Sequence, residues 1–263
     1  MALKIGQLSY ISGLPISYAF EHGLLGDVDI ESVTGYPDEL DAMMARGELA
    51  AAPISSLEYM RRDDRYTLIP DISIGSWGRM GSTILFGREP FAKLQGQTVA
   101  LPPHGATTSA LARWLISRLY GVEAKFVEAE GTLEALLSQY PAALLIGDQA
   151  IVEARKPGEV ALRLDLGEAW WQAMHVPFVH TLWATQADLP REQRQHLVEL
   201  VARAKELSKV HHEEIVAEAS ARLEIPAEEI EAYFALLNYD FTPVHRQGLA
   251  MFGDYLEEMS LLA

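Results

Sequence analysis

The chain of 263 residues contains no cysteine, which excludes disulfide bridges, thiolate metal sites and cysteine nucleophiles. It also has no apolar run that approaches the roughly 18 residues of a membrane-spanning helix. The N-terminal stretch has no continuous apolar segment of the kind that a secretory signal carries. From the missing membrane span and signal segment we expect a soluble, cytoplasmic protein with no membrane partner, while the absence of cysteine is neutral on the compartment.

Basic residues are few in this sequence. Lys and Arg total 21 against 37 Asp and Glu, which gives a formal net charge of −16. A charge of this sign opposes binding to phosphate backbones and anionic lipids, so we expect no nucleic-acid partner. A small anionic ligand remains compatible with it, because a local site can oppose the overall field. The oligomeric state is not indicated by any feature of the sequence.

Several motifs of catalysis and cofactor binding are also missing. The sequence has no GxxxxGK[ST] phosphate loop, no GxSxG elbow and no HExxH pair. Gly75, Gly78 and Gly81 form GxxGxxG, which is not the dinucleotide fingerprint. His211 and His212 would point about 100° apart on a helix and would not share a face. We therefore predict neither a metal nor an organic cofactor.

The elements that the sequence does predict alternate between short apolar strands and amphipathic helices. The clearest helix covers residues 37–46, with Pro37 at its start, two acidic residues in its first turn and Gly47 behind it. A second series of strands and helices begins near Thr98. This alternation predicts an α/β protein whose mostly parallel sheets are covered by helices, as one large domain or as two lobes.

The last quarter of the sequence, from Pro190 onward, is helical and acidic by its pattern. Pro226 and Pro243 are expected to divide it into about three helices.

Ligands of parallel sheets bind at the carboxyl ends of the strands, so candidate binding residues are those in the turns after the predicted strands. Thr107, Thr108 and Ser109 open a predicted helix directly after a glycine-containing turn. They fit two interpretations equally well. One is an ordinary helix N-cap, which needs a single hydroxyl. The other is an anion site, where free backbone N–H groups, the helix dipole and the hydroxyls converge on a carboxylate or phosphate.

Four serines lie at or near predicted strand ends, and a single serine there is usually a loop residue. Together they suggest a cleft of neutral hydrogen-bond donors for an oxygen-rich ligand. They are Ser9, Ser12, Ser56 and Ser82.

Three titratable side chains in the same turns and strands have two interpretations each. Asp148 can cap its helix or act as a base or hydroxyl acceptor, and capping is favoured. His180 lies inside an apolar strand and is more typical of a core histidine than of a catalytic one. His104 precedes the hydroxyl triplet, in a turn where exposed histidines are common.

Several blocks of the sequence, in order, resemble the chorismate dehydratases of the futalosine route to menaquinone. They cover about residues 3–185 and include KIGQLSYISGLPI, AAPISSLEYMRR, VALPPHGATTSALARWLI, ALLIGDQAI and PFVHTLW. The blocks IGDQAI, DLGEAW and PFVHTLW favour this family over its sister, the 1,4-dihydroxy-6-naphthoate synthases of the same route.

The resemblance implies a two-lobed fold like that of the type II periplasmic binding proteins, with mixed, mostly parallel sheets and a helical C-terminal segment. Residues 1–88 with 186–263 would form lobe one, and residues 89–185 would form lobe two. The chain would cross between the lobes near residues 88–90 and 180–185, and the acidic helices would pack on lobe one. The ligand would lie in the cleft between the lobes.

The resemblance also implies an activity: a lyase that converts chorismate, a small anionic substrate, to 3-[(1-carboxyvinyl)oxy]benzoate and water without a cofactor. Ser12 and Asp148 would be catalytic, and Ser12 stands where the family motif has asparagine. The substrate-binding residues implied are Ser9, Ser56, Ser82, Thr107, Thr108 and Ser109. The sister synthase and a non-catalytic solute-binding or sensory module remain as alternatives.

Overall fold

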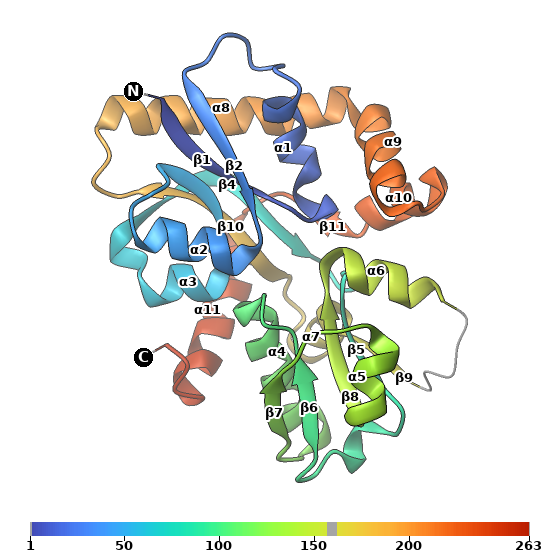
Figure 1. Ribbon diagram of the computed structural model, residues 1–263. Helices are drawn as coiled ribbons and strands as arrows, with labels where there is room; N and C mark the ends of the chain where they lie inside the picture. Colours follow the sequence, from blue (N-terminus) through green and yellow to red (C-terminus); the bar gives the residue numbers. More distant parts are fainter. Residues whose placement is uncertain (1, 157–161, 263) are drawn as a thin grey trace.

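Two mixed β-sheets, each covered by helices, organise the computed structural model, which describes residues 2–156 and 162–262 (Figure 1). In the described residues the first sheet has the order β11-β4-β10-β3-β1-β2, and the second has the order β7-β6-β8-β5-β9. The strands of the first sheet are β1 (Leu3–Leu8), β2 (Ile30–Gly35), β3 (Ala51–Ser55), β4 (Tyr66–Ser76), β10 (Phe178–Gln186) and β11 (Leu237–Asn238). The strands of the second are β5 (Thr83–Gly87), β6 (Thr98–Leu101), β7 (Lys125–Glu128), β8 (Ala142–Ile146) and β9 (Leu162–Asp165).

The helices lie between these strands in the chain and then form its end. Those of the first series are α1 (Leu14–Glu21), α2 (Pro37–Ala45) and α3 (Ser56–Arg61). Those of the second series are α4 (Ala106–Tyr120), α5 (Leu133–Gln139), α6 (Gly147–Arg155) and α7 (Leu166–Met174). The C-terminal helices are α8 (Arg191–Val210), α9 (His212–Leu223), α10 (Ala227–Phe234) and α11 (Pro243–Glu258).

The helix predicted at residues 37–46 is confirmed as α2. The carboxylate of Glu39, in its first turn, accepts a hydrogen bond from the backbone N–H of Tyr36 at 2.8 Å. That contact satisfies one of the donors that the start of a helix leaves free, and Pro37 needs none.

Both sheets are mixed, as predicted, but the parallel share is smaller than expected. Among the described residues β1 pairs in parallel with β2 and β3, and β6 pairs in parallel with β7 and β8. The pairs made by β5 and β10 are all antiparallel. These are the strands that follow the two crossings of the chain between the sheets, and each enters its sheet against the direction of its neighbours.

The crossings lie earlier in the chain than the family resemblance implied. β5 belongs to the second sheet although the predicted lobe one extended to residue 88, and β10 belongs to the first sheet although the predicted lobe two extended to residue 185. The chain therefore passes between the sheets at residues 77–82 and returns at residues 175–177. On this basis we propose lobes of residues 2–76 with 178–262, and of residues 83–156 with 162–174.

The C-terminal segment forms four helices in the described residues, one more than the prolines predicted. The additional break lies between α8 and α9 at His211, whose backbone is not helical. A helix can end without a proline where the next helix packs in a new direction, as Figure 1 shows for α8 and α9.

The expectation that all of these helices pack on lobe one is incomplete for α11, which contacts β10 and α3 of lobe one but also packs on lobe two. Phe252 and Leu256 of α11 are buried in the same hydrophobic cluster as Leu115 of α4 and Trp170 of α7. The ring of Tyr255 stacks on that of Trp114 at 4.4 Å between centroids. Helix α8, by contrast, packs with α1 against the first sheet. The chain end therefore ties lobe two to lobe one.

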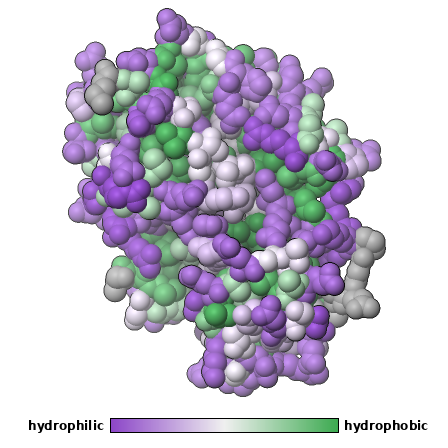
Figure 2. All heavy atoms as spheres, in the orientation of Figure 1, coloured by the Kyte–Doolittle hydropathy of each residue, from purple (hydrophilic) through white to green (hydrophobic). Residues whose placement is uncertain are grey.

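Hydrophilic residues dominate the face of the molecule shown in Figure 2, with apolar residues visible in smaller groups between them. Within residues 2–156 and 162–262, no helix combines the length and the apolar character needed to cross a membrane.

Candidate active site between the lobes

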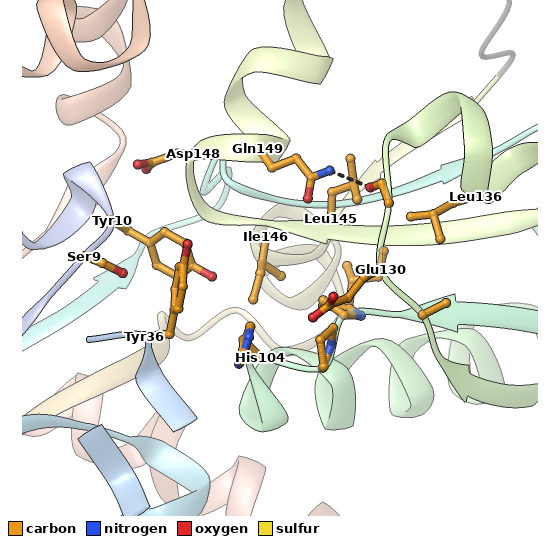
Figure 3. A pocket seen from close by; sticks show the side chains of 15 residues that line it. Ser9, Tyr10, Tyr36, His104, Glu130, Leu136, Leu145, Ile146, Asp148 and Gln149 are labelled. Carbon is orange, nitrogen blue, oxygen red and sulfur yellow. Dashed lines mark hydrogen bonds between the residues drawn. The ribbon is translucent and has the colours of Figure 1, made fainter. Parts of the chain in front are cut away.

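Two adjoining cavities lie between the two sheets. The inner cavity has a volume of about 60 Å³ and the outer one of about 320 Å³, and Tyr10 and Ile146 line both. Each cavity takes residues from the strand ends of both lobes, as expected for a ligand site in this class of sheet. Polar residues of the inner cavity are Ser12, Ser55, Ser82, Thr83, Thr107, Thr108, His180 and Thr181. Those of the outer cavity include Ser9, Tyr36, His104, Glu130, Asp148 and Gln149 (Figure 3).

The inner cavity gathers four of the predicted catalytic and substrate-binding residues. Ser12 comes from the 3-10 turn Ile11–Gly13 behind β1, Ser82 precedes β5, and Thr107 and Thr108 lie in the first turn of α4. All four are buried. The wall is therefore rich in uncharged hydroxyls, which can both donate and accept hydrogen bonds.

Two buried tyrosines of the C-terminal segment support these serines. The hydroxyl of Tyr233 donates to Ser82 Oγ at 3.1 Å, and that of Tyr239 donates to the backbone carbonyl of Ser12 at 2.9 Å. Burial raises the pKa of both phenols above its usual value, so they stay protonated donors at neutral pH. The helical tail thus positions the serines as well as covering the first sheet.

Ser12 is not a helix cap. The residue that precedes α1 is Gly13, and neither the 3-10 turn nor α1 has a side-chain cap. Its side chain instead interacts with the hydroxyl of Tyr233, at the wall of the inner cavity.

The mouth of the outer cavity is formed by three aromatic rings from both lobes. Tyr36 of lobe one stacks on His104 of lobe two with ring centroids 4.9 Å apart and an interplanar angle of 10°. The ring centroid of Tyr10 lies 5.4 Å from that of Tyr36, and Figure 3 shows these two rings between Ser9 and Ile146, with His104 below Ile146. The hydroxyl of Ser9 is buried at this wall and has no hydrogen-bond partner among the described residues.

Gly147, at the start of α6, allows Tyr10 to approach this closely. Its φ is +60°, and a Cβ there would lie 2.4 Å from ring atoms of Tyr10. Any other residue would combine a strained backbone with a clash, so the ring position depends on this glycine.

Asp148 does not cap α6, so the favoured interpretation of the sequence is wrong. The N-cap position is Ile146, and Asp148 lies inside the first turn. Its Oδ1 instead accepts a hydrogen bond from the backbone N–H of Ile11 in lobe one at 3.0 Å. Burial raises the pKa of Asp148 to about 6, against the lowering effects of the Ile11 hydrogen bond and of Arg222. The carboxylate is therefore mostly ionised at pH 7 but more basic than an ordinary aspartate.

The hydroxyl triplet at the start of α4 is not a cap either. The N-cap is Gly105, and no side chain of the triplet caps the helix. Thr107 Oγ1 accepts a hydrogen bond from the backbone N–H of Leu57, on α3 of lobe one, at 2.9 Å. Thr108 faces the inner cavity, and Ser109 lines neither cavity.

An anion does lie at the start of α4, and it is the carboxylate of Asp38 from α2. Both of its oxygens accept from Gly105 N–H, at 3.1 and 3.0 Å, and one lies 3.4 Å from Ala106 N. The carboxylate at this helix start is thus supplied by the protein itself, and a ligand anion bound by the hydroxyl triplet stays a prediction.

Asp38 and Asp148 form reciprocal contacts across the cleft, which we call the aspartate clasps. Asp38 of lobe one accepts a hydrogen bond from the backbone at the start of α4 in lobe two. Asp148 of lobe two accepts one from the backbone of the 3-10 turn before α1 in lobe one. A carboxylate that accepts backbone N–H groups makes a charge-assisted hydrogen bond. The described conformation is therefore a closed one.

Two of the predicted substrate-binding residues are not brought to the cavities. Ser56 is fully buried and donates its hydroxyl to the backbone carbonyl of Val179 at 2.6 Å. Ser109 is half-buried further along α4. The other predicted site residues line the two cavities, and their roles in binding and catalysis stay predictions.

Sequence reasoning missed Tyr10, Tyr36 and Asp38. The signal for Tyr10 was present, since it lies in the SY pair of the first block. Asp38 gave no signal, because an acidic residue in the first turn of a helix is already explained by that helix's own dipole. Among the described residues, no cluster of three or more His, Cys, Asp or Glu side chains could hold a metal ion.

Comparison with known proteins supports the family implied by the sequence. A family model described as menaquinone biosynthesis matches residues 3–258. The chorismate dehydratase of Thermus thermophilus is 31% identical over 265 residues, covering 94% of this chain and 95% of the relative.

The solved structures that resemble this one show the fold. A protein from Archaeoglobus fulgidus superposes with a TM-score of 0.81 at 20% identity, covering 99% of this chain and 98% of that one. The periplasmic aliphatic sulphonate-binding protein of Escherichia coli superposes with a TM-score of 0.68 at 13% identity, covering 99% and 88%. The fold is therefore that of the periplasmic binding proteins.

Proposed function

Because this chain belongs to the menaquinone biosynthesis family, we propose that it is a chorismate dehydratase, a cytoplasmic lyase that works without a metal or organic cofactor. The observation that carries the proposal is the likeness to a chorismate dehydratase along nearly the whole of both chains. The interlobe site supports it, because its two cavities offer uncharged donors and one basic carboxylate.

The proposed reaction removes water from the ring of chorismate. The ring carbon that bears the enol ether loses its proton, the neighbouring carbon loses its hydroxyl group, and a double bond forms between them. Proton and hydroxide leave as water, and the ring becomes aromatic. The enzyme has to hold a dianion, assist loss of the proton and stabilise the departing hydroxyl.

Within this proposal Asp148 is the proton acceptor and Ser12 orients the substrate. Asp148 has a pKa near 6 and lines the outer cavity, so it can take up a proton at neutral pH more readily than an exposed carboxylate. Ser12 does not cap a helix, and a serine hydroxyl does not titrate at neutral pH. It stands in for the family asparagine with a shorter side chain.

The inner cavity, at about 60 Å³, holds only part of a substrate that needs on the order of several hundred Å³, and the adjoining outer cavity of about 320 Å³ would hold the rest. We propose that the lobes separate to admit the substrate and close again over it, which excludes water from the reacting ring.

The test is incubation of the purified protein with chorismate, followed by proton NMR. We expect aromatic ring signals to grow as the cyclohexadiene signals of chorismate disappear, at a rate unchanged by a chelator. Binding of chorismate without turnover would indicate the solute-binding alternative and would refute the proposal. Loss of activity with chelator would refute cofactor independence alone.

A further inference from the structure

His180 is a buried, uncharged group in the wall of the inner cavity that no step above uses. Its side chain is 8% exposed, and its Nε2 atom has no hydrogen-bond partner among the described residues. An unpaired polar nitrogen in a protein interior costs about 1–3 kcal/mol. Such a cost is tolerated where the group has a partner that the free protein lacks.

The strand is irregular at this residue. Val179 of β10 pairs with Gly75 of β4, yet Thr181 pairs with Ile74, so two steps along β10 match one step along β4. This is a β-bulge with His180 as the extra residue. Bulges turn a side chain away from the direction that regular alternation would give it, and they are common beside active sites. Here the bulge brings consecutive residues, His180 and Thr181, to the same cavity.

The surroundings of the ring are neutral. Thr83, Thr108 and Thr181 line the same cavity, and the ring edge packs against Phe178 with centroids 4.6 Å apart. Burial lowers the pKa of His180 to about 3, so the imidazole carries no charge at physiological pH. A neutral imidazole offers one donor and one acceptor, which matches a hydroxyl group and suits a carboxylate less well.

A second unpaired atom lies in the same wall. Thr83 Oγ1 is buried without a hydrogen-bond partner among the described residues, and Thr83 belongs to lobe two whereas His180 belongs to lobe one. Two unsatisfied polar groups whose residues line one cavity from opposite lobes indicate a polar ligand group between them.

We propose that His180 is a substrate-positioning residue, whose neutral imidazole hydrogen-bonds the ring hydroxyl of the substrate inside the inner cavity. The proposal rests on the proposed function for the identity of the substrate. In this arrangement the side of the ring that carries the leaving hydroxyl lies in the inner cavity, against the imidazole and the threonines. The carboxylates then lie toward the outer cavity and its mouth.

The test compares His180→Phe with His180→Gln. Phenylalanine keeps a ring of similar size but removes both nitrogens, and glutamine restores a neutral amide near the position of Nε2. We expect His180→Phe to lower kcat/KM for chorismate about 5- to 100-fold, the range of one lost hydrogen bond. His180→Gln should recover part of that loss. The inflections of the pH profile should not move, because the imidazole does not titrate in the working range.

Ser17→Ala provides a matched control. Ser17 is also a buried residue whose hydroxyl has no partner among the described residues, but it lines neither cavity. This variant should keep the wild-type kcat/KM. Full activity in His180→Phe, or an effect confined to its unfolding midpoint, would overturn the proposal.

An independent readout separates this proposal from the proposed function. The imidazole nitrogen signals of His180 can be assigned in ¹⁵N-histidine-labelled protein by their absence in His180→Phe, and then followed as chorismate is added. We expect the Nε2 signal to shift on binding. A shift without aromatic product would keep His180 as a ligand contact and refute the dehydratase. An unchanged signal would overturn the His180 proposal, whether or not product forms.

Discussion

At the scale of single residues, the hydroxyl groups around the cleft divide by what they contact. Thr107 and Thr108 are neighbours in the first turn of α4, and both are buried. Both line the inner cavity, but the hydroxyl of Thr107 also accepts a backbone hydrogen bond from Leu57 in the other lobe. Adjacent residues on a helix point in different directions, so one can hold structure while the other meets the ligand.

Replacing each threonine by alanine should therefore give opposite results. Thr107→Ala leaves a buried N–H unpaired and should lower the free energy of unfolding by about 1–3 kcal/mol. Thr108→Ala should leave stability nearly unchanged and lower kcat/KM for chorismate by roughly 10- to 100-fold. Denaturant unfolding and steady-state kinetics on both variants measure this. The reverse pattern would show that Thr108 is structural.

At the scale of elements, a buried carboxylate links α2 to the start of α3. Asp41 Oδ1 accepts from the backbone N–H of Ser55 at 2.8 Å, and Ser55 Oγ in turn accepts from Glu58 N–H at 3.1 Å. Burial raises the pKa of Asp41 to about 7, against the lowering effect of Ser55. The junction between β3 and α3, which carries Ser55 to the inner cavity, therefore depends on an acid that titrates near neutrality.

The pH dependence of stability follows from that pKa. The folded value lies above the ordinary aspartate value of 3.8, so the neutral form favours the folded state. The contribution of protonated Asp41 to the free energy of unfolding is complete below about pH 4 and is lost as the pH rises toward 7. Asp41→Asn keeps an acceptor for Ser55 but cannot ionise. We expect it to raise the free energy of unfolding at pH 8 by about 1–3 kcal/mol and to have little effect at pH 4.

The control for this variant is Asp188→Asn, because Asp188 is exposed. It should not change the dependence of stability on pH. Equal stability of Asp41→Asn and the wild type at pH 8 would show that burial does not raise the pKa of Asp41.

At the scale of the whole molecule, the lobes are joined by the aspartate clasps as well as by the two crossings and α11. Asp38 binds the backbone at the start of α4, and Asp148 binds Ile11 N–H. A substrate with two carboxylates carries the same chemistry as these side chains. The clasps therefore hold the lobes closed at the cost of occupying backbone donors that an anion can use.

Removing one clasp should open the free protein. A charge-assisted hydrogen bond contributes about 1.5–3 kcal/mol, so Asp38→Ala should raise the ratio of open to closed molecules by roughly 10- to 100-fold. Small-angle scattering should then show a larger radius of gyration without ligand and a decrease when chorismate is added. Asp188→Ala should scatter like the wild type. An unchanged radius for Asp38→Ala would mean that the crossings and α11 alone set the closure.

The amino-acid sequence by itself determined the local structure and much of the chemistry of this protein. The proline, acidic turn and glycine around residues 37–46 specify α2 because helix ends have local hydrogen-bonding needs. The ordered sequence blocks were enough to identify the family, and the position of Ser12, Ser82 and Thr108 at strand ends was enough to place them near a cleft.

Only the tertiary structure decided which of these groups meet. β5 and β10 each belong to the other sheet than the predicted lobe boundaries implied. Strand pairing depends on partners that are distant in the sequence, and a local apolar pattern does not specify them. Asp38 reaches Gly105 across 67 residues, and the bulge that brings His180 to the inner cavity exists only in its pairing with β4. Periodicity fixes the direction of a side chain relative to its own element, but the groups that it contacts depend on how the elements pack.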